Sequence, residues 1–376
     1  MIIGIDANEA NENRLVGIGR YALELIKNLH LLLLNSHNAG IAVEIYLKDE
    51  PGKQLPPEKD FWRYRVFGPR FLWTQFALPW QLYTAATRPD IFFSTTHYAP
   101  RFSPIKTVVS VMDLSYLHFP ETFLRKDLWQ LKNWTDYSVA AAAKVITISK
   151  SSKADILKHY DIPEDKVEVV YPGINRRLFN DKKAKGEAEF IRRRYQLRGD
   201  YLLYVGTVQP RKNLDRLLNA FSRLYRRRPD LQLVIAGKKG WLYGEFLRKM
   251  DAEGIKKKLV FTGFVADADL PALYRQAKAL VQPSLYEGFG IPVVEAMACG
   301  IPVAVSNTSS LPEVAAGAGL LFDPASTDDL ARALETACYN EKVRLSLIRK
   351  GKERAAAFSW EKSSRKLLNI LESVSL

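Results

Sequence analysis

A glycine-containing loop, a short apolar helix and a buried strand follow one another without interruption in residues 284–305. Pro292 stands at the predicted helix start, where its fixed φ suits a helix and its missing N–H leaves no donor unpaired. Gly300 ends the helix, and the apolar run after it is typical of a buried strand. Free N–H groups point out of a helix N-terminus and the helix dipole adds a favourable potential, so this segment predicts an anion-binding site.

Two carboxylates bracket the predicted anion site. Glu287 lies in the loop, and Glu295 lies about one turn into the helix. A carboxylate would repel a phosphate, so we expect the pair to accept hydrogen bonds from sugar hydroxyl groups. The structural alternative is that Glu287 caps the helix while Glu295 faces water. We favour ligand binding, because an aromatic residue between glycines and a Gly-Ile-Pro-Val strand accompany the pair.

This segment closely resembles the signature of retaining GT-B glycosyltransferases of family four, in which seven residues separate two glutamates. The resemblance implies that Glu287 contacts the donor sugar and that Glu295 binds the nucleotide ribose. It also assigns donor contacts to the loop residues Gly288, Phe289, Gly290 and Ile291. The motif is specific for the family, but it does not identify the sugar.

Predicted strands and helices alternate along the chain, which indicates an α/β protein with two doubly wound domains. The 376 residues suffice for two full hydrophobic cores. We place the first domain at residues 1–180 and the second at 181–356, with residues 181–200 as a charged linker. The resemblance implies the GT-B architecture, in which Rossmann-like acceptor and donor domains face a cleft. It also implies that the terminal helix, residues 357–376, crosses back onto the first domain.

The composition restricts the cellular compartments and the partners that we expect for this chain. Only Cys299 and Cys338 are present, so we expect no disulfide framework and a reducing, cytoplasmic compartment. We expect no signal peptide, and no apolar run approaches the roughly 20 residues of a membrane helix. The net charge of +14 fits nucleic acid, anionic lipid or a phosphorylated small molecule. No nucleic-acid-binding module is evident, so we expect no nucleic-acid partner.

A second glycine loop, Gly17-Ile18-Gly19-Arg20-Tyr21-Ala22, opens a predicted helix. It matches the dinucleotide fingerprint formally, but it begins about ten residues after the preceding strand instead of directly at its end. A glycine loop at a helix start still allows close approach of a phosphate, and the family has one near the donor diphosphate. We therefore assign Gly17 and Gly19 to donor binding; the alternative is a tight turn that only starts a helix.

Residues 61–81 combine basic and aromatic side chains, among them Trp62, Phe71, Phe76 and Trp80. Such a mixture suits peripheral contact with the inner face of a membrane. The alternative is that the aromatic rings pack in the core around a strand and a helix, with the arginines outward. We favour the core, because the stretch lacks one continuous amphipathic stripe.

Polar residues just past strand ends predict further site residues in the first domain. Asp113 follows the predicted strand 107–112 and is our candidate for a catalytic role. The resembling family usually carries a histidine immediately before this aspartate, where this chain has Met112. His97 and His118 are candidate replacements that would contact the acceptor or the sugar, and either could instead be a structural histidine.

In the second domain, Arg211 and Lys212 lie between a predicted strand and a helix. Two adjacent cations there suit a diphosphate, with arginine as a fork and lysine as a point charge, although a solvated pair is the alternative. The family places such a pair at the phosphates, and we add Thr207 and Val265 as donor contacts. Asp267 and Asp269 imitate a metal-binding Asp-x-Asp motif; we reject a metal site because Asp269 is expected to cap a helix.

The resemblance implies a retaining hexosyltransferase that uses a nucleotide diphosphate sugar, a glycan or lipid-linked acceptor, and no metal or other cofactor. The segment 204–213 resembles mannosyltransferases of polysaccharide and O-antigen assembly, so GDP-mannose is the first expected donor. A phosphorylase or a sugar-nucleotide epimerase of the same fold remains an alternative. A non-catalytic sugar-binding protein is disfavoured by the retained glutamates and cations, and a nicotinamide dehydrogenase by the displaced glycine loop.

Overall fold

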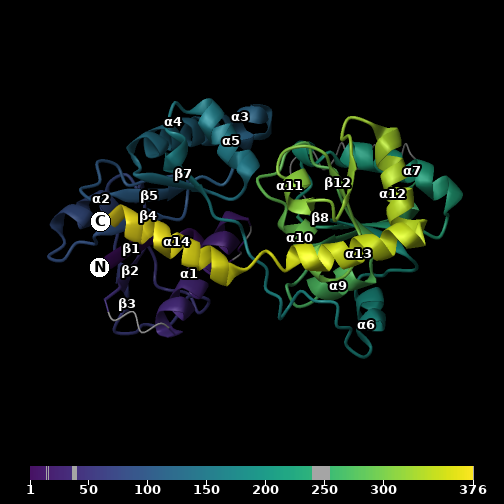
Figure 1. Cartoon of the computed structure of the whole chain (residues 1–376), viewed down its shortest axis with the longest axis horizontal. Helices are drawn as coiled ribbons and strands as arrows, with labels where there is room; N and C mark the ends of the chain where they lie inside the picture. The colour runs from purple at the N-terminus through teal and green to yellow at the C-terminus, as the bar shows by residue number, and fades with distance from the viewer. Residues whose placement is uncertain (14, 16, 36–39, 239–254, 376) are drawn as a thin grey trace. The chain divides into compact units, whose positions relative to one another are not determined.

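The structure is a computed structural model that describes residues 1–13, 15, 17–35, 40–238 and 255–375. The chain forms two compact units, Met1–Gly173 with Ser359–Leu376, and Ile174–Phe358 (Figure 1). The first boundary lies seven residues before the one predicted at 180/181. Each unit contains its own parallel sheet, so the predicted α/β class with two doubly wound domains is confirmed.

The sheet of the first unit has the strand order β3-β2-β1-β4-β5-β6-β7, and every neighbouring pair is parallel. The order reverses between β1 and β4, and such a switch point is where open α/β sheets bind ligands. The strands are β1 Ile2–Asp6, β2 Ala42–Leu47, β3 Trp62–Val66, β4 Ile91–Ser94, β5 Thr107–Ser110, β6 Lys144–Thr147 and β7 Val167–Val169.

Helices cover both faces of this sheet. Successive residues of a strand point to opposite faces, and here the residues on both faces are apolar. On β4, Phe93 joins the core under α1 and α14, whereas Phe92 joins the core under α2. The helices are α1 Ile18–Asn35, α2 Ala77–Thr84, α3 Ser115–His118, α4 Arg125–Ala141, α5 Lys150–His159 and α14 Trp360–Ser375, with 3₁₀ turns η1 Glu9–Asn11, η2 Pro120–Thr122 and η3 Glu164–Lys166.

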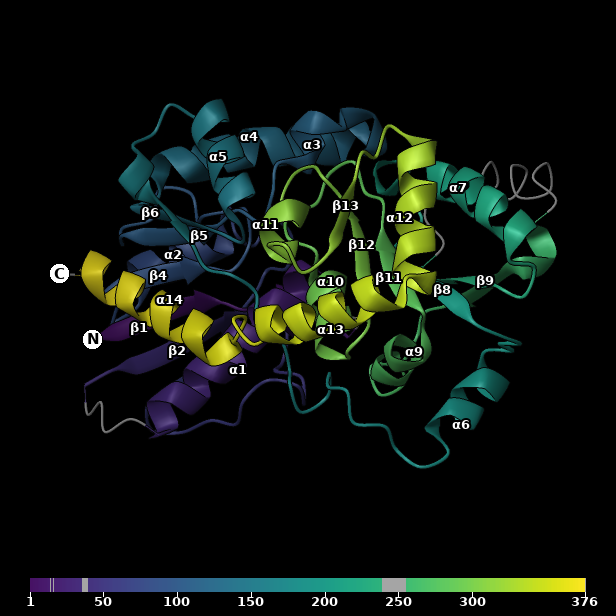
Figure 2. The ribbon, with the colours of Figure 1, turned by 45° about the vertical axis from the view of Figure 1, so that its right-hand side comes forward.

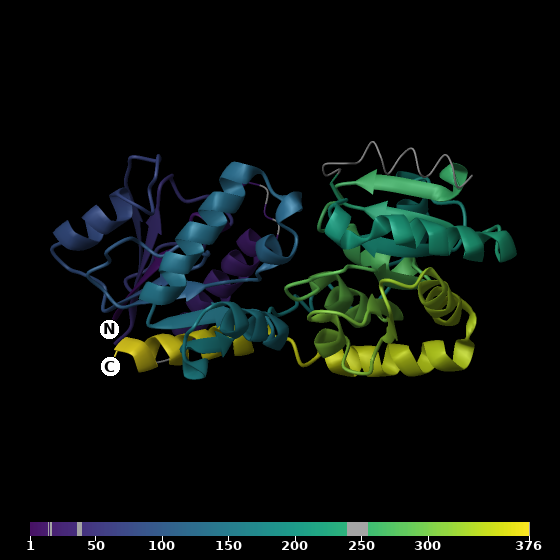
Figure 3. The same cartoon turned by 90° about the horizontal axis from the view of Figure 1, so that it is seen from above.

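The last helix belongs to the first unit, although it comes last in the chain. Figure 2 shows α14 lying along α1, and the hydroxyl of Ser364 donates to the carbonyl of Leu25 at 3.2 Å. Gly173 permits this arrangement, since a Cβ there would collide with the backbone of Trp360. The two chain ends consequently lie close together (Figure 3).

The sheet of the second unit has the order β10-β9-β8-β11-β12-β13 and is also parallel. The strands are β8 Tyr201–Val205, β9 Gln232–Ala236, β10 Leu259–Gly263, β11 Ala279–Gln282, β12 Val303–Ser306 and β13 Leu320–Phe322. The helices are α6 Glu187–Arg194, α7 Leu214–Arg227, α9 Leu270–Gln276, α10 Ile291–Ala298, α11 Leu311–Ala315, α12 Thr327–Tyr339 and α13 Glu341–Ala355, with η4 Pro210–Lys212 and η5 Lys256–Lys258.

The segment predicted as a charged linker contains a helix instead, α6. Ile191 is fully buried on its inner side. Glu187 forms a bidentate pair with Arg275 of α9, with N–O distances of 2.9 and 2.5 Å. The sequence prediction was wrong because contacts with a segment about 90 residues away stabilise this helix, whereas its own sequence is mostly charged.

The preferred interpretation of residues 61–81 is only half correct. Trp62 and Trp73 are buried, as a core location requires. Phe71 in the loop before α2 and Phe76 at the N-cap of α2 are exposed. Trp80 is exposed because α2 uses its other face to pack on the sheet.

Candidate active site

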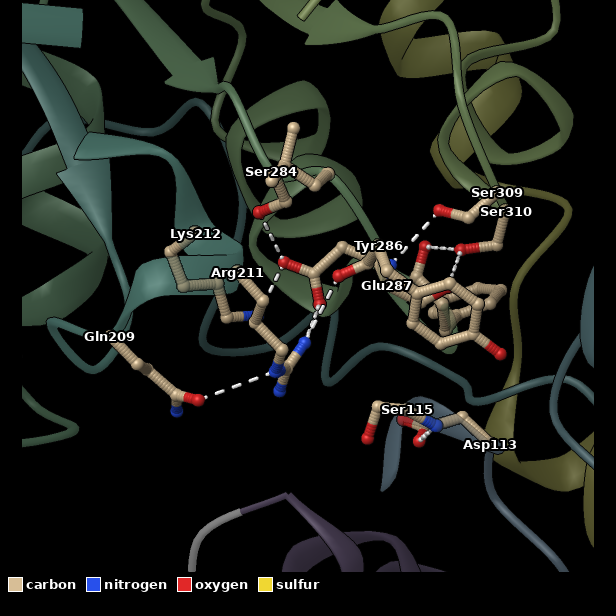
Figure 4. Close-up of polar contacts among 12 residues, drawn as sticks. Asp113, Ser115, Gln209, Arg211, Lys212, Ser284, Tyr286, Glu287, Ser309 and Ser310 are labelled. Carbon is tan, nitrogen blue, oxygen red and sulfur yellow. Dashed lines mark hydrogen bonds and ion pairs between the residues drawn. The ribbon is translucent and has the colours of Figure 1, made fainter. Parts of the chain in front are cut away.

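A buried cluster of two cations and one carboxylate forms at the carboxyl edge of the second sheet (Figure 4). Glu287 is 8% exposed, and Lys212 Nζ donates to its Oε1 at 2.5 Å. The same oxygen accepts hydrogen bonds from the Ser284 hydroxyl and the Gln282 amide, both at 2.7 Å. Arg211 lies 3.6 Å from the other carboxylate oxygen. The structure thus brings together three of the predicted site residues.

The charge on Glu287 is fixed by these neighbours. Burial alone would raise the pKa of this carboxyl, but Lys212 and Arg211 outweigh burial and hold its pKa at about 2. The carboxylate is therefore ionised at neutral pH. The cations are not a solvated surface pair, because both face a buried counter-charge.

Hydrogen bonds between two loops hold the cations in place. Arg211 Nη1 donates to the carbonyl of Tyr286 at 3.0 Å, and the N–H of Leu285 donates to the carbonyl of Arg211 at 2.8 Å. The side chain of Asn213, which has a left-handed backbone, donates to the carbonyl of Pro283 at 3.0 Å. The loop after β8 and the loop after β11 therefore position the cluster as one unit.

The glycine loop leads into the N-terminus of α10, as predicted. Gly290 has φ 106°, which favours glycine, and a Cβ there would lie 2.9 Å from Leu311 Cδ2. Ser310 supports the loop by donating to the carbonyls of Glu287 and Phe289 at 2.9 and 2.8 Å (Figure 4). Ser309 accepts from the N–H of Glu287 at 2.9 Å. These supporting serines were visible in the sequence only as polar residues after a strand.

Glu295 is buried on α10, so the alternative that it faces water is wrong. Its Oε2 accepts a hydrogen bond of 2.8 Å from the hydroxyl of Tyr274, which is itself fully buried on α9. Tyr274 was missed in the sequence because nothing in its local pattern separates it from an ordinary core tyrosine.

The remaining predicted donor residues of this unit lie at the same sheet edge. Thr207 follows β8, and its carbonyl accepts from the hydroxyl of Tyr204 at 3.3 Å. Val265 follows β10 with its side chain buried, whereas the neighbouring Phe264 is exposed.

Asp269 occupies the N-cap position of α9, but its side chain makes no capping hydrogen bond. Its carboxylate accepts from the Tyr195 hydroxyl at 2.8 Å and pairs with Arg194 at 3.0 Å. The predicted position of Asp269 at the helix start is correct, but the predicted capping hydrogen bond is absent. Within the described part of the chain, no three His, Cys, Asp or Glu side chains gather in a way that could hold a metal ion.

In the first unit, the structure brings Asp113 and His97 together after β5 and β4. Asp113 accepts a hydrogen bond from the N–H of Ser115 at 2.9 Å (Figure 4). The N–H of Met112 points to His97 Nε2 at 3.4 Å, and His97 Nδ1 is buried without a partner among the described residues. Burial lowers the pKa of His97, although Asp113 acts in the opposite direction. His118 pairs instead with Asp155 at 3.5 Å.

Asp6, at the carboxyl end of β1, is a buried carboxyl that the sequence reasoning missed. Burial raises its pKa to about 6, although Asn8 donates two hydrogen bonds to it. The signal in the sequence was a polar residue ending an apolar strand.

In the glycine loop at the start of α1, Gly19 is explained by packing, since a Cβ there would lie 2.7 Å from the carbonyl oxygen of Glu9. Gly17 has φ 50° and immediately precedes α1; the donor contact of both glycines stays a prediction.

Two families match the chain in succession. Residues 187–354 match the family described as glycosyl transferases group 1, and residues 16–178 match glycosyltransferase family 4. O-antigen chain mannosyltransferase B of Escherichia coli is 29% identical over 405 residues, covering 97% of this chain and 98% of that protein. The D-inositol 3-phosphate glycosyltransferase of Salinispora tropica is 32% identical over 250 residues, covering 62% of this chain and 51% of that protein.

Solved structures share the fold. The sucrose-phosphate synthase of Thermosynechococcus elongatus superposes with a TM-score of 0.77 at 19% identity, over 99% of this chain and 98% of that chain. HepE of Anabaena, solved in complex with UDP and glucose, has a TM-score of 0.77 at 18% identity, over 99% and 100% of the two chains. At these identities the likeness establishes the fold, and it confirms the predicted GT-B class of two Rossmann-like domains.

Proposed function

Because the chain belongs to the group 1 glycosyltransferases of family 4, we propose that it transfers a hexose from a nucleotide diphosphate sugar with retention of configuration. The buried cluster of Arg211, Lys212 and Glu287 is the observation that carries this proposal. Mannose from GDP-mannose is the first candidate, supported by the name of the Escherichia coli relative. A glycan or lipid-linked glycan is the proposed acceptor.

Charge develops on the diphosphate as the bond to the sugar breaks. Hydrogen bonds hold Arg211 and Lys212 in place without a ligand, so in this proposal the two cations, together with the N-terminus of α10, stabilise the leaving diphosphate with little reorganisation. Glu287 neutralises the cations before the donor arrives and then accepts hydrogen bonds from sugar hydroxyl groups. We assign deprotonation of the acceptor to the leaving phosphate, and a contact with the sugar or acceptor to Asp113 and His97.

A panel of nucleotide sugars tests the reaction. GDP-mannose is expected to give the largest rise in melting temperature and slow hydrolysis, with the released sugar keeping its anomeric configuration by NMR. Strict dependence on inorganic phosphate, with formation of a sugar 1-phosphate, would instead establish a phosphorylase. The absence of stabilisation by every nucleotide sugar and diphosphate would refute the donor site.

Transfer is expected to survive EDTA, because protein cations and a helix N-terminus serve the diphosphate in this proposal. Steady-state rates measured before and after dialysis against EDTA check this expectation. Loss of activity that manganese restores would contradict it and would direct attention to Asp267 and Asp269.

Glu295→Gln is expected to raise the donor KM about tenfold or more with little change in kcat, because a charge-assisted ribose contact binds ground state and transition state alike. Tyr274→Phe should shift KM in the same direction by a smaller factor, since it frees the carboxylate that Tyr274 orients. Tyr201→Phe is the matched control: Tyr201 is equally buried, but its hydroxyl donates to the carbonyl of Leu273. Equal donor KM values for the Glu295 variant and the wild type would remove the ribose role.

A further inference from the structure

One face of α2 is aromatic and exposed. Trp80 and Tyr83 are three residues apart in α2, so their side chains share one side of the helix. Phe76 occupies the N-cap position immediately before them. Trp80 is 71% exposed and Phe76 is 65% exposed. The opposite side of α2, which includes Leu78 and Leu82, packs on the sheet. The fold is therefore complete without the aromatic side.

Two adjacent loops extend this surface. Phe71 is 79% exposed in the loop before α2, and Phe102 is 72% exposed in the loop before β5. Arg101 Nε donates to Gln75 Oε1 at 2.9 Å and so ties the second loop to the first. We call this surface the aromatic patch: Phe71, Phe76, Trp80, Tyr83 and Phe102.

The chain around the aromatic patch is strongly basic. Residues 61–106 contain six cations and a single carboxylate, Asp90, whose oxygen accepts from the N–H of Ile2. Arg65 and Arg70 pair with Glu44 and Asp49 respectively, which leaves a net positive charge. The six cations are Arg63, Arg65, Arg70, Arg88, Arg101 and Lys106.

We propose that the aromatic patch docks this protein on an anionic lipid bilayer. Aromatic rings flanked by arginines suit the boundary between headgroups and acyl chains, where the rings are partly buried and the guanidinium groups meet phosphates. A neutral glycan would gain nothing from the net positive charge of this stretch, whereas anionic headgroups would be attracted by it. A second copy of the chain would bring equal positive charges together. No helix within the described ranges is long and apolar enough to cross a membrane.

The inference deepens the proposed function, because a lipid-linked acceptor lies in a membrane, but its test needs no donor or acceptor. The full chain is mixed with vesicles of phosphatidylcholine alone or with phosphatidylglycerol added, and the bound fraction is measured by flotation. Binding is expected only to the anionic vesicles and is expected to weaken at high salt. The Phe76→Ser/Trp80→Ser double variant should bind about tenfold or more weakly, since it removes two rings from the bilayer interface.

Trp129→Ser is the matched control, because Trp129 of α4 is similarly exposed outside the patch, and this variant should bind like the wild type. Unchanged GDP affinity and melting temperature would show that the double variant is folded. Failure of the wild type to bind anionic vesicles, or undiminished binding by the double variant, would overturn the proposal. The proposal would also be overturned if the wild type formed a dimer by ultracentrifugation, or bound a neutral oligosaccharide, and the double variant did not. Neither result would touch the donor site, which GDP binding reports separately.

Discussion

Replacing Glu287 by glutamine is expected to lower kcat by at least about a hundredfold, while nucleoside diphosphate still binds. The amide keeps the shape of the side chain but loses the charge that holds Lys212 at 2.5 Å and the acceptor strength needed for sugar hydroxyl groups. Removing a negative charge beside the diphosphate site should leave GDP affinity unchanged or increased. Steady-state kinetics and calorimetry with GDP measure the two effects separately.

The matched control for this variant is Glu187→Gln. The Glu187 carboxylate is buried to the same degree and also pairs with a cation, Arg275, but this pair fastens α6 to α9. Both variants should lose stability, because each leaves a cation without its counter-charge. Only Glu287→Gln should lose turnover. Near-normal kcat in Glu287→Gln would end the proposed sugar contact.

Replacing Lys212 by methionine is expected to lower kcat about a hundredfold, equivalent to about 3 kcal/mol of transition-state stabilisation. The ammonium is buried and held by Glu287, so in the proposed function it stabilises the charge that develops on the diphosphate with little reorganisation. GDP affinity should fall as well, in contrast to the glutamate variant. Arg211→Lys should recover only part of the wild-type rate, since a point charge cannot reproduce the fork that also binds the carbonyl of Tyr286.

Lys278→Met provides the comparison for Lys212. Lys278 pairs with Asp200 at 3.0 Å, and the two residues precede β11 and β8, at the opposite edge of the same sheet. Wild-type kcat and GDP affinity are expected for this variant. If Lys212→Met behaved in the same way, the cluster would be structural and the phosphate site would lie elsewhere.

The fold class and the location of the candidate site were predictable because they depend on local patterns. The loop before α10 combines glycines with a proline at the helix start, and Arg211 and Lys212 lie in the short connection between β8 and α7. These signals need only neighbouring residues. The pairing of the cations with Glu287 was not predictable, since 75 residues separate Lys212 from Glu287 and only the sheet order brings them together.

Two other features depend on partners that a local pattern cannot reveal. The helix α6 forms from a charged segment because Arg275 provides a distant counter-charge. In α2 both sides are apolar, so the sequence could not show which side packs and which side stays exposed. The side of α2 that packs is the one with Leu78 and Leu82, which contacts Phe92 of the sheet.

The place of α14 in the first unit has a consequence for synthesis on the ribosome. The second unit is continuous, Ile174–Phe358, and can fold as soon as it emerges. The first unit emerges earlier but lacks the apolar side of α14, including Leu367 and Leu371, which covers its core. At typical elongation rates the intervening residues take roughly 10–40 s to make. During that interval the nascent first unit exposes a strip of its interior beside α1. Exposed apolar surface of this kind aggregates, so we expect a chaperone that covers the strip to raise the yield of folded protein.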